Sequence, residues 1–152
     1  MNHLPPLFDH IEGRRTSPTV PLNLDVTDSS TGLGLQPALA TSQKGVDTAI
    51  AAASKAYGDG EWSNAESFEK ANALDSVADQ LEASVEQMAE LDAQTTGITL
   101  HWTGLMAQLV PIIFRKSAEL LRKEVLDTEL PGKYGNVSVR SYPLGPAALI
   151  CP

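Results

Sequence analysis

The stretch at residues 140–152 constrains the possible fold more than any other part of the chain. Alternating side chains in 136–142 are typical of a strand, and a Pro-Leu-Gly-Pro corner follows at 143–146. Every side chain from Ala147 to Cys151 is apolar. A short apolar run behind a turn is typical of a strand that is buried on both faces of a parallel sheet. We therefore expect the first strand of such a sheet here, with its neighbouring strands outside these 152 residues.

Short strands are predicted at the other end of the chain. Residues 7–13 are expected to form a strand that enters a turn, and 14–18 are expected to form a polar loop. Residues 22–41 have the pattern of a hairpin, with turn-forming residues at 28–32. Because Pro37 has no backbone N–H to donate, the second strand of this hairpin is expected at a sheet edge.

Three regions between these ends have helical periodicity. They are residues 42–57, 64–95 and 102–125. The second region is one long helix or two helices that meet at 83–84. Residues 126–135, which contain two glycines and a proline, are expected to form a loop before the strand near the end of the chain.

Single residues predict where these helices begin and end. Ser42 is a suitable N-cap, the triplet Gly58-Asp59-Gly60 is a suitable stop for the first helix, and Gly97 is a suitable stop for the second region. Pro111 breaks the backbone hydrogen-bond pattern, so the third helix is expected either to start near Val110 or to kink. The apolar stripes of the helices are expected to face a core. In the third region this stripe consists of Trp102, Leu105, Leu109, Ile112, Ser117 and either Leu120 or Leu121.

Composition limits the classes of partner. Hydrophobic residues make up 42% and charged residues 20% of the chain, which is ordinary for one globular domain. The net charge of −8 argues against nucleic acid and anionic membranes, which are themselves polyanions. The sequence shows no signal peptide and no apolar run long enough to span a membrane. With one cysteine and no intrachain disulfide, a cytoplasmic location is expected.

Motifs that carry chemistry are nearly absent. The sequence contains no phosphate-binding glycine loop, metalloprotease motif, CxxC pair or nucleophile elbow. His3, His10 and His101 are dispersed along the chain, so no metal site and no catalytic residue are predicted. Cys151 lies within an apolar run without a neighbouring base, where a cysteine usually packs as a small hydrophobic residue.

Three segments together resemble a known family. The final R-x-x-P-L-G-P-A-A-L-I-C-P is similar to R-x-P-x-G-V-x-x-x-I-x-P-W-N of the NAD(P)-dependent aldehyde dehydrogenases. The pattern V-D-x-A-x-A-A-A-x-x-A-Y at 46–57 resembles the first helix of that family. Residues 69–97 resemble its next two helices, although Lys70 replaces the usual arginine. The resemblance covers roughly residues 22–152, and this chain has neither the Trp nor the Asn that closes the family pattern.

The resemblance implies an α/β fold and a division of the chain. Residues 1–135 would be the N-terminal strands and helices of the cofactor-binding domain. Residues 136–145 would be an oligomerisation-type strand and corner, and 146–152 the first strand of a Rossmann-like sheet that is truncated before it is complete. In the family the backbone at the positions matching Cys151 and Pro152 borders the nicotinamide cofactor.

The resemblance also implies a function for the parent enzyme. It would oxidise a small aldehyde to a carboxylic acid with NAD or NADP, and it would be a homo-oligomer through residues 136–142. The catalytic cysteine, its glutamate base, the cofactor lysine and the oxyanion asparagine of the family are not found in these 152 residues. The chain alone is therefore expected to be inactive and to bind no cofactor. The alternative from another class is a small acidic helical protein that acts as a non-catalytic interaction module.

Overall fold

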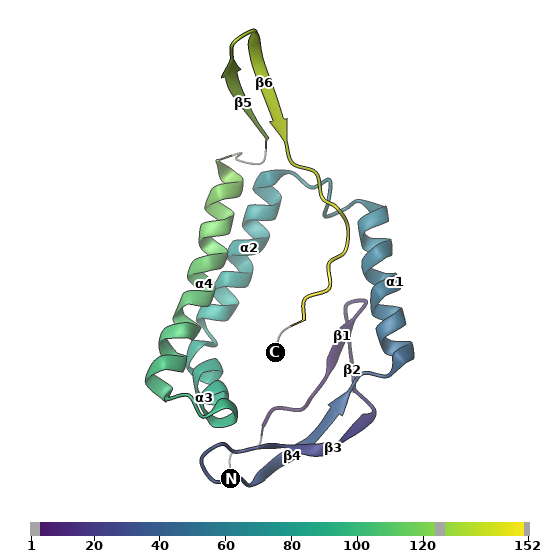
Figure 1. Ribbon diagram of the computed structural model, residues 1–152, viewed down its shortest axis with the longest axis vertical. Coiled ribbons are helices and arrows are strands. Elements are labelled where there is room, and N and C mark those ends of the chain that lie inside the picture. The colour runs from purple at the N-terminus through teal and green to yellow at the C-terminus, as the bar shows by residue number, and fades with distance from the viewer. Residues whose placement is uncertain (1–3, 124–126, 151–152) are drawn as a thin grey trace.

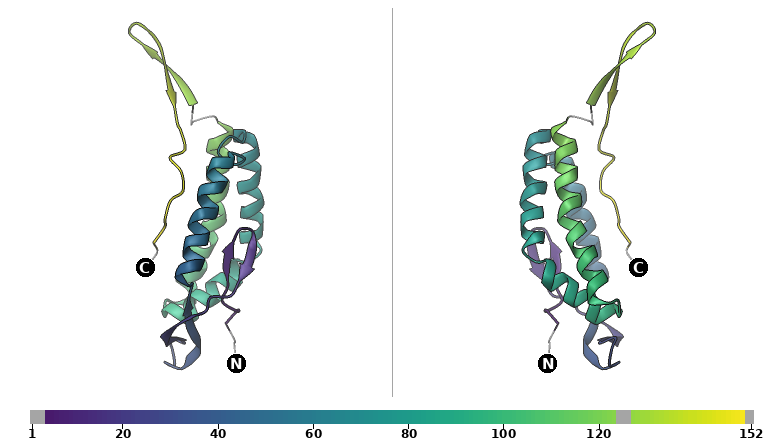
Figure 2. Two further views of the ribbon diagram at one scale, coloured as in Figure 1. Left: turned by 90° about the vertical axis from the view of Figure 1, so that its right-hand side faces the viewer. Right: turned by 90° about the vertical axis from the view of Figure 1, so that its left-hand side faces the viewer.

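The computed structural model describes residues 4–123 and 127–150, and it shows helices and hairpins arranged around an open centre (Figure 1). Helices α2 (Ser67–Glu82) and α4 (Leu100–Arg122) lie side by side, and α1 (Gln43–Asp59) stands across the open centre from them (Figures 1 and 2). Of the three hairpins in the described residues, the one over 20–40 lies at the base and the one over 127–140 projects from the opposite end (Figure 1). The elements in chain order are β1 (Asp9–Ile11), β2 (Arg14–Thr16), β3 (Val20–Thr27), β4 (Gly34–Ala40), α1 (Gln43–Asp59), α2 (Ser67–Glu82), α3 (Val85–Thr96), α4 (Leu100–Arg122), β5 (Asp127–Gly132) and β6 (Gly135–Arg140).

The ends of the helices follow the local sequence. The Ser42 hydroxyl accepts a hydrogen bond from the Gly45 N–H at 3.2 Å, which begins α1. Gly60 and Gly97 adopt positive φ values of 77° and 80° and end α1 and α3. Residues 64–95 form two helices that meet at Ala83 and Ser84, so the two-helix alternative is confirmed.

Pro111 lies inside an uninterrupted helix. Helix α4 begins at Leu100, so the alternative start near Val110 is wrong. Proline cannot donate to the carbonyl of Ala107, one turn earlier. Both residues are buried, on the side of α4 that packs against α2 and α3. Tertiary packing on this side therefore maintains the helix across the missing hydrogen bond.

Small side chains form the buried contacts between the helices. Thr103 is 1% exposed, and its hydroxyl donates to the Ala89 carbonyl oxygen at 2.8 Å. Such residues allow two helix backbones to approach closely. The buried hydrophobic residues are Ala71 and Ala78 of α2, Ala89 of α3, and Ala107 and Ala118 of α4.

The predicted apolar stripe of α4 is not the buried face of that helix. Trp102 and Ile112 are each 57% exposed, and Leu105 and Leu109 are also exposed. The face that packs against α2 and α3 instead carries the alanines of α4. The prediction was wrong because a periodic stripe shows which side is apolar, whereas burial depends on a covering element, and no described element covers this stripe.

The structure contains strands where loops were predicted. Arg14–Thr16 pairs with β1, and Asp127–Gly132 pairs with β6, with Leu130 opposite Val137. The β5–β6 hairpin turns through Lys133 and Tyr134, which is a common two-residue connection. The sequence signal for β5 was the alternation of Thr128 and Leu130, which the flanking Pro131 and glycines obscured.

The hairpin predicted at 22–41 is confirmed. β3 and β4 pair antiparallel and form a two-stranded sheet, so Pro37 is in an edge strand as expected. The turn of this hairpin contacts the end of α3, because the Ser29 N–H donates to the Gln94 carbonyl oxygen at 2.9 Å. This contact joins the base of the molecule to the helical side.

Candidate functional site

The candidate site is the chain end that leads to Cys151 and Pro152. These two residues, predicted to border a cofactor, lie outside the described part of the chain. The preceding residues 141–150 form no regular secondary structure, so the strand predicted over 147–151 is not present in its described part, 147–150. Leu149 and Ile150 are 89% and 93% exposed. A β-strand requires a partner strand for its backbone groups, and none of the described strands pairs with this stretch.

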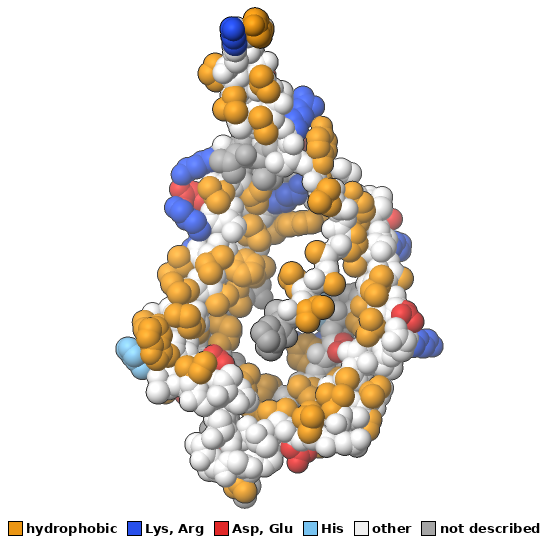
Figure 3. All heavy atoms as spheres, in the orientation of Figure 1, with side chains coloured by type: hydrophobic (Ala, Val, Ile, Leu, Met, Phe, Trp, Pro, Cys, Tyr) orange, Lys and Arg blue, Asp and Glu red, His pale blue; other side chains and the backbone are white. Residues whose placement is uncertain are grey.

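This stretch passes in front of the helices. It descends from β6 between α1 and the α2–α4 pair in one view, and the side views place it to one side of the helices (Figures 1 and 2). Hydrophobic side chains gather around the hollow that it crosses (Figure 3). The stretch therefore presents apolar side chains and free backbone groups next to α1.

Two cavities lie along α1 at the corner of this stretch. The first, of about 570 Å³, has Tyr57, Trp62 and Lys70 on one side and Tyr142 and Gly145 on the other. Its lining is mainly apolar. The Lys70 ammonium group donates to the Ser63 carbonyl oxygen at 3.0 Å. This hydrogen bond ties the loop between α1 and α2 to α2.

The second cavity, of about 600 Å³, lies further along the stretch. It is formed by Ile50 and Ala53 of α1, by Ile11 of β1, and by Ala147 and Ala148. Apolar side chains from α1 and from the stretch thus face one space. The geometry is suitable for packing against a flat apolar group or against further secondary structure.

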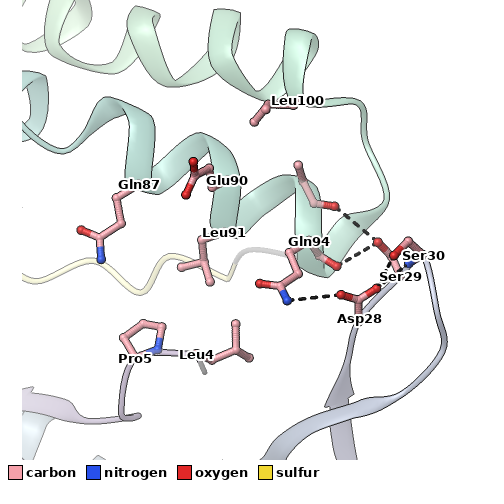
Figure 4. Close-up of a pocket in the computed structure, with 11 residues that line it drawn as sticks. Leu4, Pro5, Asp28, Ser29, Ser30, Gln87, Glu90, Leu91, Gln94 and Leu100 are labelled. Carbon is pink, nitrogen blue, oxygen red and sulfur yellow. Dashed lines mark hydrogen bonds between the residues drawn. The ribbon is translucent and has the colours of Figure 1, made fainter. Parts of the chain in front are cut away.

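A third cavity, of about 640 Å³, lies away from this stretch, where the β3–β4 turn meets α3 (Figure 4). Asp28 accepts hydrogen bonds from the Ser30 hydroxyl at 2.6 Å and from the Gln94 side-chain amide at 3.2 Å. These hydrogen bonds, that of Ser30 above all, hold the pKa of Asp28 well below its usual range. The Gln94 contact and the hydrogen bond from the Ser29 hydroxyl to the Gln94 carbonyl oxygen at 2.9 Å fasten the turn to α3.

Ion pairs join α2 and α4 on the outer surface. The Arg115 guanidinium lies 2.9 Å from the Asp79 carboxylate and also contacts Glu82, and the Arg122 guanidinium lies 2.6 Å from the Asp75 carboxylate. The pKa of Arg115 is raised, first by its hydrogen bond to Glu82 and then by that to Asp79. These contacts join the two helices across their outer surface.

The described residues do not offer a metal site or a membrane span. No group of three or more histidine, cysteine or acidic side chains converges in residues 4–123 or 127–150. Within the same ranges no helix has the length and apolar character needed to cross a bilayer. What the site can supply is an apolar surface with free backbone groups, as found where a chain borders a bound cofactor or enters a sheet.

Comparison with known proteins identifies the class. Residues 19–152 match the model of the aldehyde dehydrogenase family, and the chain belongs to this family. The prediction of an N-terminal portion of an aldehyde dehydrogenase is thereby confirmed.

Individual relatives agree with this assignment. The chain is 29% identical over 110 residues to betaine aldehyde dehydrogenase of Bacillus subtilis, a match that covers 63% of this chain and 22% of the relative. The chain thus spans about a quarter of the length of its relatives.

Solved structures show the same fold. The betaine aldehyde dehydrogenase of Staphylococcus aureus, determined in complex with NAD+, matches with a TM-score of 0.71 at 20% identity over 86% of this chain and 26% of that one. An NAD-dependent benzaldehyde dehydrogenase of Corynebacterium glutamicum matches with a TM-score of 0.69 at 22% identity over 82% and 26%. The predicted fold class, an α/β arrangement of the aldehyde dehydrogenase type, is confirmed.

Proposed function

We propose that this chain is part of an oxidoreductase that oxidises an aldehyde to a carboxylic acid and transfers the hydride to NAD or NADP. The family match over residues 19–152 carries this proposal. The arrangement shared with the NAD+-bound Staphylococcus structure supports it. Family membership also favours this function over a non-catalytic interaction module.

In this proposal the chain end contributes backbone to the cofactor site. Cys151 and Pro152 would border the nicotinamide ring, and Cys151 would not be the nucleophile. The apolar surface of Ala147 and Ala148, facing the cavity beside α1, is compatible with a flat ring. The chain has no glycine-rich phosphate loop, so the phosphates of a dinucleotide would require residues beyond this segment.

The isolated chain is proposed to be inactive and to bind no cofactor. The described residues supply an apolar surface but no catalytic cluster, and the sequence holds one cysteine, in the apolar run at its end. A nucleophile, its base and most cofactor contacts would come from the remaining length of the enzyme. We place this enzyme in the cytoplasm, on the basis of the sequence features above.

The β5–β6 hairpin is proposed as the place where subunits meet. β6 carries Val137 and Val139, which are 54% and 45% exposed, and its only described partner is β5. A two-stranded hairpin is marginally stable alone, and its outer edges have unpaired backbone groups that can bind another strand. We propose that residues 136–142 join a second copy in a homo-oligomer.

One assay tests the enzymatic proposal. NADH formation from a panel of small aldehydes is measured for the pure 152-residue chain and for the enzyme of family length that carries this segment. We expect saturable NADH production from the longer enzyme and none from the chain. Activity of the chain alone would contradict the assignment of the nucleophile to another segment, and a longer enzyme inactive with every aldehyde would contradict the proposed reaction.

A further inference from the structure

One side chain fastens the corner of the chain end to α1. The Tyr57 hydroxyl donates to the Pro143 carbonyl oxygen at 3.0 Å, across 86 positions of sequence. Within the described residues this is the one hydrogen bond that ties 142–150 to another element. The stretch begins at a second tie, from the Ser141 N–H to the Asp127 carboxylate at 3.3 Å, which lies within its own hairpin.

The ring of Tyr57 also lies against the corner. Gly145 adopts a φ of 120°, a conformation that residues with a side chain rarely take. A Cβ atom at Gly145 would lie 4.0 Å from Cε1 of the Tyr57 ring, so the ring lies just at contact distance from the turn. Tyr57 therefore meets the corner both with its hydroxyl group and with its ring.

Tyr57 lies on a helix whose two ends are capped. It lies near the C-terminal end of α1, a helix with a side-chain cap at Ser42 and a left-handed stop at Gly60. Beyond the corner, Leu149 and Ile150 are almost fully exposed, so side-chain packing does little to fix the end of the stretch. The course of the stretch then depends on the corner.

We propose that Tyr57 is a positioning residue, whose hydroxyl, acting through the Pro143 carbonyl, sets the course of residues 144–150 and so the place where this stretch meets a nicotinamide dinucleotide. The link to the dinucleotide rests on the proposed function, whereas the fastening of the corner stands on the geometry alone. Tyr57 does not touch reacting atoms, so it is not a catalytic residue.

The fastening is tested in the 152-residue chain with Tyr57→Phe, which removes only the hydroxyl group. We expect the ¹⁵N order parameter of Gly145 to fall below about 0.6, while amides of α2 and α4 keep values near about 0.85. Trypsin should cut after Arg140 about fivefold faster, because an exposed hydrogen bond of this kind shifts a local equilibrium by roughly that factor.

Tyr134→Phe is the matched control. Tyr134 lies at the tip of the β5–β6 hairpin and is 92% exposed. Removal of its hydroxyl should therefore leave the Gly145 order parameter and the trypsin cleavage rate unchanged. Gly145→Ala, a change in the corner itself, should also loosen it, because an alanine is strained at this φ. If Tyr57→Phe leaves both the Gly145 order parameter and the cleavage rate at wild-type values, the proposal is overturned.

The link to the cofactor is tested with the same substitution in the enzyme of family length. We expect KM for the dinucleotide to rise about fivefold with kcat nearly unchanged, the pattern of lost binding without lost chemistry. An unchanged KM alongside a loosened corner would refute the positioning role toward the cofactor. A wild-type enzyme that reduces no dinucleotide would refute the proposed function instead, while the measurements on the 152-residue chain still decide the fastening.

Discussion

The pair of helices α2 and α4 differs from the segment 127–150 in the contacts that stabilise it. The helices pack through alanines that are 0% exposed and are joined by the Arg115 and Arg122 ion pairs. The segment has a two-stranded hairpin and an extended stretch whose side chains are almost all exposed. The helical pair is thus stabilised by contacts within the chain, whereas the segment exposes groups that another strand or element can bind.

The largest expected effect is a loss of stability from disrupted packing between α2 and α4. Ala78→Asp places a charge at a fully buried position between α2 and α4, and we expect a loss of about 3–5 kcal/mol of unfolding free energy. Urea unfolding followed by far-UV circular dichroism measures it. Gln80→Asp, at an exposed position of the same helix, is the control and should change little. Equal stability of the two variants would show that α2 and α4 do not pack as described.

The next largest effect is on self-association through the open edge of the β5–β6 hairpin. We expect the isolated chain to self-associate and Val139→Pro to weaken that association about tenfold or more, because proline removes the donor that faces Thr128 and so disrupts the hairpin that presents this edge. Sedimentation velocity over a wide concentration range measures it. Val139→Thr keeps the N–H group and should retain most of the association. A strictly monomeric wild-type chain would contradict the proposed role of residues 136–142.

A smaller effect is expected at the end of the segment. In the enzyme of family length, Cys151→Ala should change kcat less than about tenfold, because the nucleophile is proposed to lie elsewhere and Cys151 is proposed to supply only packing and backbone. Steady-state kinetics at saturating aldehyde and dinucleotide measures it. A loss of several orders of magnitude in a folded variant would place the active site at Cys151.

The smallest effect is on stability at low pH, and it comes from Glu119 of α4 with its partners Lys116 and Lys123. Hydrogen bonds from Lys116 and then Lys123 lower the pKa of Glu119 from 4.5 to about 2. Because the pKa is lower in the folded chain, this carboxylate stabilises the fold above pH 4.5, and the contribution is lost as the pH falls toward about 2. Glu119→Gln should remove a small part of the acid dependence of the thermal midpoint. Identical pH profiles of variant and wild type would show that the cluster contributes nothing measurable.

Predictions from local signals agreed with the structure. The Ser42 cap, the stops at Gly60 and Gly97 and the joint at Ala83–Ser84 depend on interactions within a few residues, and the structure shows each of them. Predictions that depended on contacts between residues far apart in the sequence agreed less often with the structure. The strand β5 was missed because its pairing with β6, rather than its own composition, forms it. The candidate site stays a prediction at Cys151 and Pro152.

The sequence alone determined the helical regions, the start of α1, the ends of α1 and α3, the first long hairpin and the family, because these depend on local capping, turn chemistry and ordered motifs. Only the tertiary structure decided which faces are buried. It buried Ala107 and Ala118 of α4 and left Trp102 exposed, because burial depends on which element packs against a face. It likewise left 147–150 without strand structure and fastened the corner before it through Tyr57 and Pro143. That contact joins residues far apart in the sequence, so no local pattern predicts it.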